Sequence, residues 1–143
     1  GDRSLGVGSL HPMRLLLDTH IWLWALLEPE RLAADVRAAL ESPENELWLS
    51  PISVWEAMLL AERGRLSVPV PVGDWVREMV SAIPRREAPL THEVAILSRE
   101  LSLAHQDPAD RFLAATARAF ELTLVTADER LLGSTGFATM ANR

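Results

Sequence analysis

The residue types and spacing of four acids suggest a catalytic or ligand-binding site. These acids are Asp18, Glu56, Asp110 and Asp128. Asp18 follows the apolar run LLL, Asp128 follows LTLVT, and Glu56 comes shortly after the run ELWLS. If these runs are parallel strands, their carboxyl ends meet at one edge of a sheet, where open α/β sheets bind ligands. Asp110 lies in the first turn of a predicted helix. We therefore expect the four carboxylates to converge on one crevice.

Four carboxylates in one crevice require a cation or bound protons, because their like charges repel when water is excluded. Oxygen ligands without cysteine or histidine select Mg²⁺, with Mn²⁺ as a substitute, over Zn²⁺. Such an ion keeps waters, binds substrate phosphate and activates a water for attack. The pattern predicts metal-assisted hydrolysis of a phosphodiester, with one ion or two.

Each acid also has a structural interpretation as a helix cap. Asp18 suits the N-cap of the next helix. The stretch SVWE is a capping box with Ser53 as N-cap and Glu56 three residues on, and TADE offers the same roles to Thr126 and Glu129. Each cap contributes about 1 kcal/mol. Taken singly, each acid is more often a cap than a ligand, so the metal hypothesis depends on the set.

The neighbours of the acids have weaker assignments. In DPAD, Asp107 suits an N-cap and is predicted to be structural, because Pro108 favours the first helical position. Arg111 could contact phosphate, but a surface ion pair is the favoured interpretation. Thr19 and Thr126 are candidates to hold a carboxylate or a bound water, besides their helix-start roles.

The elements that position these residues alternate along the chain, which predicts an α/β domain with a parallel sheet. The stretch 68–74 is broken by prolines and is expected to be a loop, and Gly64 is expected to end the helix before it. The all-apolar helix 21–27 needs cover on every side, from this chain or another. Strands are expected at 14–17, 46–50, 87–90, 122–126 and 136–139; amphipathic helices are expected around 32–40, 75–80 and 112–120.

Composition narrows the function classes. The 143 residues suit one domain, and no apolar run is long enough to span a bilayer. There is no cysteine and all 14 basic residues are arginine, which excludes disulfides, thiolate sites and lysine chemistry and fits a cytoplasmic protein. The net charge of −6 means that a nucleic acid would bind locally rather than by diffuse attraction. Residues 1–12 suggest a leader added for expression, with Met13 as the natural start of a domain over 13–143.

Four stretches, MRLLLDTHIWLW, ISVWEAMLL, DPADRFLAATA and LVTADERL, resemble in this order the PIN-domain ribonucleases, and most closely the VapC-type toxins of type II toxin-antitoxin pairs. The resemblance runs from Met13 to the last strand. It implies a three-layer sandwich, with a central parallel sheet of four to five strands and helices on both faces. It implies a Mg²⁺-dependent endoribonuclease that leaves a 5′-phosphate and a 3′-hydroxyl. The implied metal ligands are Asp18, Glu56, Asp110 and Asp128.

The resemblance also implies partners: RNA as substrate, a cognate antitoxin, and a homodimer or toxin-antitoxin hetero-oligomer. The antitoxin would dock in a hydrophobic groove for which the helix 21–27 offers a wall. His20 and His105 flank the motifs but receive no catalytic role, because the family's metal site uses carboxylates alone.

Two rival functions remain. An aspartyl-phosphate phosphatase also places an aspartate after its first strand. That class has the pattern D-x-D and needs a lysine, whereas His20 stands two residues after Asp18 and the chain has no lysine. The other rival is a non-catalytic PIN-like module for binding or assembly, against which the presence of all four acids argues.

Overall fold

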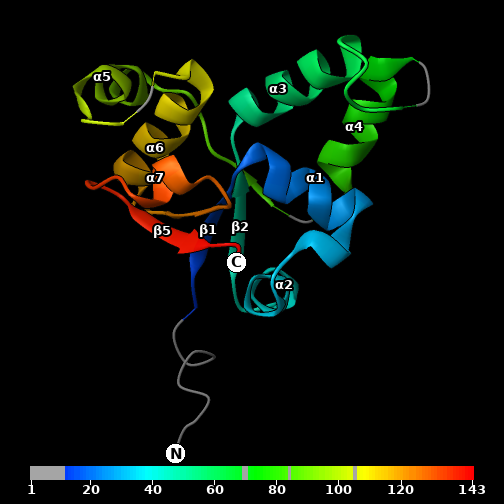
Figure 1. Cartoon of the computed structure of the whole chain (residues 1–143), viewed down its shortest axis with the longest axis horizontal. Helices are drawn as coiled ribbons and strands as arrows, with labels where there is room; N and C mark the ends of the chain where they lie inside the picture. The colour runs from blue at the N-terminus through cyan, green and yellow to red at the C-terminus, as the bar shows by residue number, and fades with distance from the viewer. Residues whose placement is uncertain (1–11, 69–70, 84, 105) are drawn as a thin grey trace, which may run out of the picture.

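The computed structural model describes residues 12–68, 71–83, 85–104 and 106–143. Five strands form one parallel sheet in the order β3-β2-β1-β4-β5. Figure 1 shows α5, α6 and α7 on one side of the sheet and α1 to α4 on the other, which confirms the predicted three-layer α/β fold. The strands are β1 (Arg14–Leu17), β2 (Glu46–Leu49), β3 (Arg86–Glu87), β4 (Thr123–Thr126) and β5 (Ala138–Ala141).

The helices include one that was not predicted, α5, which Thr91 caps by accepting a hydrogen bond from the backbone N–H of Val94. Among the described residues no helix is long and apolar enough to cross a membrane. A 3₁₀ turn, η2 (Pro29–Arg31), follows the first helix. The α-helices are α1 (Thr19–Leu27), α2 (Ala34–Glu41), α3 (Pro51–Glu62), α4 (Val72–Ala82), α5 (His92–Glu100), α6 (Pro108–Phe120) and α7 (Glu129–Leu132).

Strand β1 is the centre of the core because its three leucines are all buried. Successive side chains of a strand point to opposite faces of the sheet. Leu15 and Leu17 accordingly pack with α1 and α2 on one face, whereas Leu16 packs with Leu113 of α6 and Leu124 on the other. The continuous apolar run thus fits a strand that is covered on both faces.

The strand order reverses beside β1. From β1 the chain continues to β2 and β3 on one side, then returns to place β4 and β5 on the other. Such a switch point leaves a crevice at the carboxyl ends of the two central strands, because the connections on either side run in opposite directions. Asp18 follows β1 and Asp128 follows β4, so both begin at this crevice.

Several predicted boundaries were wrong by a few residues. The second strand stops before Ser50, which caps α3, and the last strand starts after Gly136, whose φ of 97° does not fit a strand. Helix α4 starts at Val72, inside the predicted loop, because Pro71 precedes it in an extended conformation suited to a helix N-terminus. Gly64, with φ 71°, follows α3 as predicted. Residues 69–70 and 1–11 lie outside the described residues, so the predicted leader is not tested.

Candidate functional site

Asp18 is held by hydrogen bonds from two directions. It is the N-cap of α1, where Oδ1 accepts from the backbone N–H of Thr19 at 2.7 Å. Oδ2 accepts from the hydroxyl of Thr126 at 2.6 Å. Burial raises the pKa of Asp18, and these two hydrogen bonds oppose that rise. The carboxylate of Asp18 therefore caps α1 and is also the candidate metal ligand, and its two hydrogen bonds fix its orientation.

Thr126 joins the two central strands at the crevice. Besides donating to Asp18, its hydroxyl accepts from the backbone N–H of Asp128 at 3.0 Å. The backbone N–H of Asp18 donates to Val125 at 3.1 Å, so the ends of β1 and β4 are tied twice. The capping box predicted for Thr126 and Glu129 is wrong, because Asp128 is the N-cap of α7. Asp128 accepts from the N–H of Arg130 at 2.8 Å.

Glu56 reaches the crevice from α3. The capping box predicted for Ser53 is also wrong, because Ser50 caps α3 and Ser53 lies inside the helix, fully buried. Glu56 accepts a short hydrogen bond from the Thr19 hydroxyl, which also lies 3.0 Å from the hydroxyl of Ser53. Partial burial raises the pKa of Glu56, and the charge of Asp18 raises it further. Thr19 thus links the first turn of α1 to the acid on α3.

Asp110 lies in the first turn of α6, as predicted. Asp107 is the N-cap of that helix and accepts from the backbone N–H of Asp110 at 3.2 Å, with Pro108 in the first helical position. Burial, and after it the charges of the carboxylates at 18, 107, 128 and 56, raise the pKa of Asp110 to about 8. Burial and the neighbouring negative charges therefore both favour the protonated form of Asp110.

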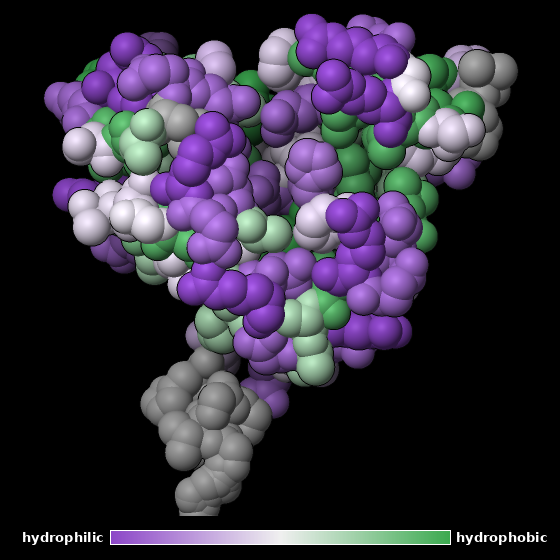
Figure 2. All heavy atoms as spheres, viewed as in Figure 1, coloured by the Kyte–Doolittle hydropathy of each residue, from purple (hydrophilic) through white to green (hydrophobic). Residues whose placement is uncertain are grey.

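All four predicted acids line one cleft of about 500 Å³, together with Asp107 and His20. In Figure 2 hydrophilic side chains dominate the face over α5, α6 and α7, whereas hydrophobic side chains gather between α3, α4 and α1. A separate apolar hollow of about 600 Å³ lies by α3 and α4 and is lined by Leu49, Val54 and Val80 but by none of the four acids. The carboxylates therefore converge as expected, and their role as ligands stays a prediction.

The donor set of this cleft fits a hard divalent cation. In the described part of the chain no three acidic or histidine side chains already surround a single ion position. Mg²⁺ does not need such a cage, because it usually binds through one or two carboxylates and keeps several waters. Burial first, and then the charge of neighbouring carboxylates, raise the pKa values of Asp18, Glu56 and Asp110, and a cation would relieve the second of these causes. The residues therefore fit Mg²⁺ or Mn²⁺ by donor type and by charge.

Arg111 has a structural role, which corrects the predicted surface ion pair, whereas the alternative of a phosphate contact stays a prediction. Its side chain is buried, and the residue is only 6% exposed. Nε donates to the carbonyl of Ser98 at 2.7 Å and Nη2 to the carbonyl of Leu101 at 2.8 Å. These carbonyls lie at the C-terminal end of α5, where a helix leaves acceptors unsatisfied. Arg111 therefore binds α6 to the end of α5.

The sequence analysis gave no part in the cleft to four other residues that line it, Asp107, Trp24, Arg31 and Arg130. Asp107 caps α6 as predicted, but its charge also raises the pKa values of Glu56 and Asp110. Its spacing of three from Asp110 was the available indication. Nothing in the sequence placed Arg31, because its position depends on the turn that follows α1. His105 lies outside the described residues.

Comparison with known proteins identifies the family. A model of the PIN domain matches residues 15–136. Ribonuclease VapC22 from Mycobacterium tuberculosis is 36% identical over 118 residues, which are 82% of this chain and 88% of that protein. The structure of DNA-bound VapBC from Salmonella typhimurium matches with a TM-score of 0.69 and 18% identity over 92% of this chain and 99% of that one. FitAcB from Neisseria gonorrhoeae matches with a TM-score of 0.65 and 25% identity, over 90% and 97%. The chain belongs to the PIN domain family and, within it, to the VapC-type toxins.

Proposed function

We propose that this protein is a Mg²⁺-dependent endoribonuclease that acts in the cytoplasm as the toxin of a type II toxin-antitoxin pair. The observation that carries the proposal is the convergence of Asp18, Glu56, Asp110 and Asp128 on one cleft at the switch point of the sheet. Its similarity to Ribonuclease VapC22 supports cleavage of RNA rather than another phosphodiester.

The protein's own residues prepare this cleft before any ion or substrate enters. Thr126 and the N–H of Thr19 fix both oxygens of Asp18, and the Thr19 hydroxyl orients Glu56. Fixed carboxylates lose little freedom on binding, which favours tight and correctly placed ligation. A bound Mg²⁺ or Mn²⁺ would supply Lewis acidity for the phosphate and would lower the pKa of an attacking water.

We also propose that the antitoxin docks along α1. The first half of this helix is used by the chain's own core, where Ile21, Trp22 and Leu23 are buried. The second half is only partly covered, and Leu27 is 45% exposed. One part of the surface of this all-apolar helix therefore packs in the chain's own core. The other part can be covered by another chain, in a toxin-antitoxin hetero-oligomer or a homodimer.

Incubation of purified, antitoxin-free protein with total RNA tests the proposed activity. Cleavage is expected with Mg²⁺ or Mn²⁺, none is expected with EDTA, and new ends should carry a 5′-phosphate and a 3′-hydroxyl. The variant Asp18→Asn should lower the rate at least about 100-fold, because charge stabilisation by a metal is worth several kcal/mol.

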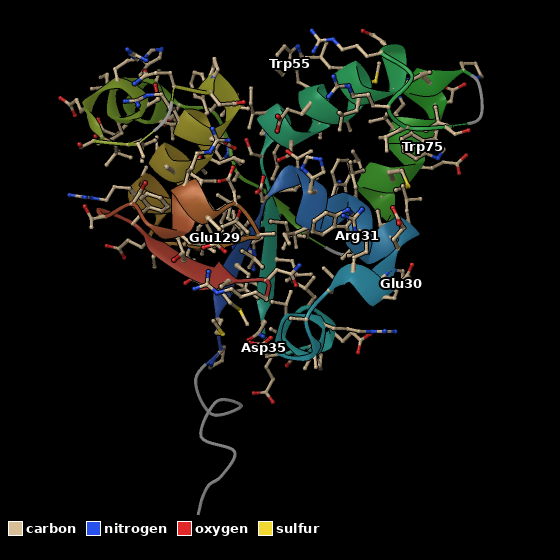
Figure 3. All side chains as sticks on the ribbon, viewed as in Figure 1. Glu30, Arg31, Asp35, Trp55, Trp75 and Glu129 are labelled. Atoms are coloured by element: carbon tan, nitrogen blue, oxygen red, sulfur yellow. The ribbon has the colours of Figure 1, made fainter. Side chains whose placement is uncertain are left out.

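Asp35→Asn is the matched control. Asp35 lies in the first turn of α2 and accepts from the backbone N–H of the next residue, as Asp18 does. Figure 3 shows it on α2, and it is not among the residues that line the cleft. Its substitution should leave cleavage unchanged. Cleavage that persists with EDTA, or in Asp18→Asn, would contradict the metal mechanism. A lack of cleavage with every RNA would favour a binding module.

A further inference from the structure

The acidic cleft has a second wall made of an aromatic ring and a guanidinium group. The Arg31 guanidinium carbon lies 4.2 Å from the ring centroid of Trp24, and the His20 ring lies 5.7 Å from that of Trp24. All three residues line the acidic cleft. The same three residues also line a neighbouring hollow of about 300 Å³. This wall therefore lies between the two spaces and borders both of them.

The neighbouring hollow has apolar side chains with charged groups beside them, two arginines and the carboxylate of Glu28. It begins where the wall ends, so a strand lying in the acidic cleft can continue over Arg31 into it. Arg65 lines it in addition to Arg31, although the chain as a whole carries a net charge of −6. Its apolar lining is provided by Leu23, Leu27, Leu60 and Leu66.

The guanidinium of Arg31 is oriented but not neutralised. Its ion pair with Glu28 is long, at 3.9 Å, and its side chain remains 51% exposed. Stacking on Trp24 holds the planar group in place while leaving N–H donors for a ligand. Figure 3 shows Arg31 lying against α1, whereas the adjacent Glu30 points outward. A held guanidinium beside an acidic site is suited to bidentate contact with phosphate.

We propose that Arg31, held by Trp24, binds a backbone phosphate of single-stranded RNA next to the scissile bond, and that the adjoining base lies in the neighbouring hollow. This inference rests on the proposed nuclease function. Single strands are bound by arginines along the backbone together with aromatic or apolar surfaces for the bases, and both occur here. A diffuse basic surface is not needed, because one or two local contacts supply the attraction.

RNA binding tests the proposal without cleavage. A fluorescein-labelled single-stranded RNA would be titrated with Asp18→Asn protein at several salt concentrations, with and without Arg31→Ala. Each phosphate contact on a single strand contributes about 0.7 to the slope of log K against log salt. Loss of one contact should therefore lower the slope by about 0.7. The ratio of the association constant at 50 mM salt to that at 1 M salt should then fall about 8-fold.

Three companion variants make the result specific. Arg37→Ala is the matched control, because Arg37 is also 51% exposed and also pairs with a glutamate that is close to it in sequence; it should change nothing. Arg31→Lys keeps the charge and should restore the slope. Trp24→Leu keeps Arg31 but removes its support, so binding should weaken with the slope retained. Circular dichroism and the melting temperature establish that each variant is folded.

The proposal is overturned if Arg31→Ala binds RNA with the same slope as Arg37→Ala. That result would leave the wall to a protein partner. In the otherwise wild-type enzyme, Arg31→Ala should raise KM for RNA with little change in kcat, whereas Asp18→Asn lowers kcat. A failure of the wild-type protein to cleave RNA would refute the nuclease function and would be visible separately from the binding slopes.

Discussion

Replacement of Thr126 by valine removes the hydroxyl that joins the two central strands at the site. Valine has nearly the same shape, so the change deletes two hydrogen bonds without opening a cavity. The bond to Asp18 involves a carboxylate and is worth about 1.5–3 kcal/mol, and the bond from the N–H of Asp128 is worth about 1 kcal/mol. We expect the free energy of unfolding to fall by about 3 kcal/mol, which is about 6–12 °C in melting temperature for a chain of this size.

The loss should depend on pH. The Thr126 hydrogen bond lowers the pKa of Asp18, so its removal lets burial raise that pKa further. In the folded variant Asp18 then keeps a proton up to a higher pH than in the wild type, whereas the unfolded chain releases it. The free energy of unfolding of the variant, relative to that of the wild type, therefore falls as pH rises. At acidic pH the protonated carboxyl needs the donor less, and the difference should shrink.

Urea denaturation at pH 5 and pH 8, followed by circular dichroism without metal, measures both effects. Thr123→Val is the control, because it makes the same change at the other end of β4, away from the carboxylates. Equal stability of Thr126→Val and Thr123→Val at pH 8 would refute the assigned role of the hydroxyl. A loss that is larger at pH 5 than at pH 8 would refute the electrostatic part.

Two other features, the Arg111 contacts and the raised pKa of Asp110, give further expectations. Arg111→Ala should lower the free energy of unfolding by about 3 kcal/mol, because two carbonyls lose a charged donor at about 1.5 kcal/mol each; a rise in KM for RNA with unchanged urea stability would instead support a phosphate contact. Without metal, stability should fall as pH rises from about 4 to about 8, because folded Asp110 retains a proton that the unfolded chain releases over this interval. Asp110→Asn should flatten that decline. Millimolar Mg²⁺ at pH 8 should raise the melting temperature of the wild type but not of the variant. Identical melting curves of the wild type with and without Mg²⁺ would contradict the metal site.

The sheet and the convergence of acids were predictable because they depend on local patterns. Continuous apolar runs such as LLL identify strands buried on both faces, and parallel strands bring their carboxyl ends to one edge. The cap at Asp107 and the turn at Gly64 follow from the conformations that aspartate and glycine favour. These features need no knowledge of distant residues.

The wrong assignments involve competition between equivalent local signals. Ser50 and Ser53 both precede the apolar part of α3, and Ser50 is the cap because Pro51 occupies the first helical position. Thr126 and Asp128 compete in the same way for α7, and the hydroxyl of Thr126 is taken by Asp18 from 108 residues away. The local proline decided the first case, and a tertiary contact decided the second.

The role of Arg111 depended entirely on tertiary structure. An arginine beside an aspartate suggests a surface pair, but α5 ends where the Arg111 side chain can reach its carbonyls. Arg31 and Trp24 are similar, because they meet only after the turn η2 brings the guanidinium back over α1. Side chains that act across elements were the part that the sequence could not reveal.

The separation of 108 residues between Asp18 and Thr126 has a consequence for synthesis on the ribosome. Strand β1 is synthesised well before β4, its partner at the crevice. A partly synthesised chain holds Asp18 and Glu56 without Asp110 and Asp128, and contacts so distant in sequence form late in folding. The crevice is therefore completed only after β4 and α7 have been synthesised, because a shorter nascent chain carries an incomplete set of the four acids.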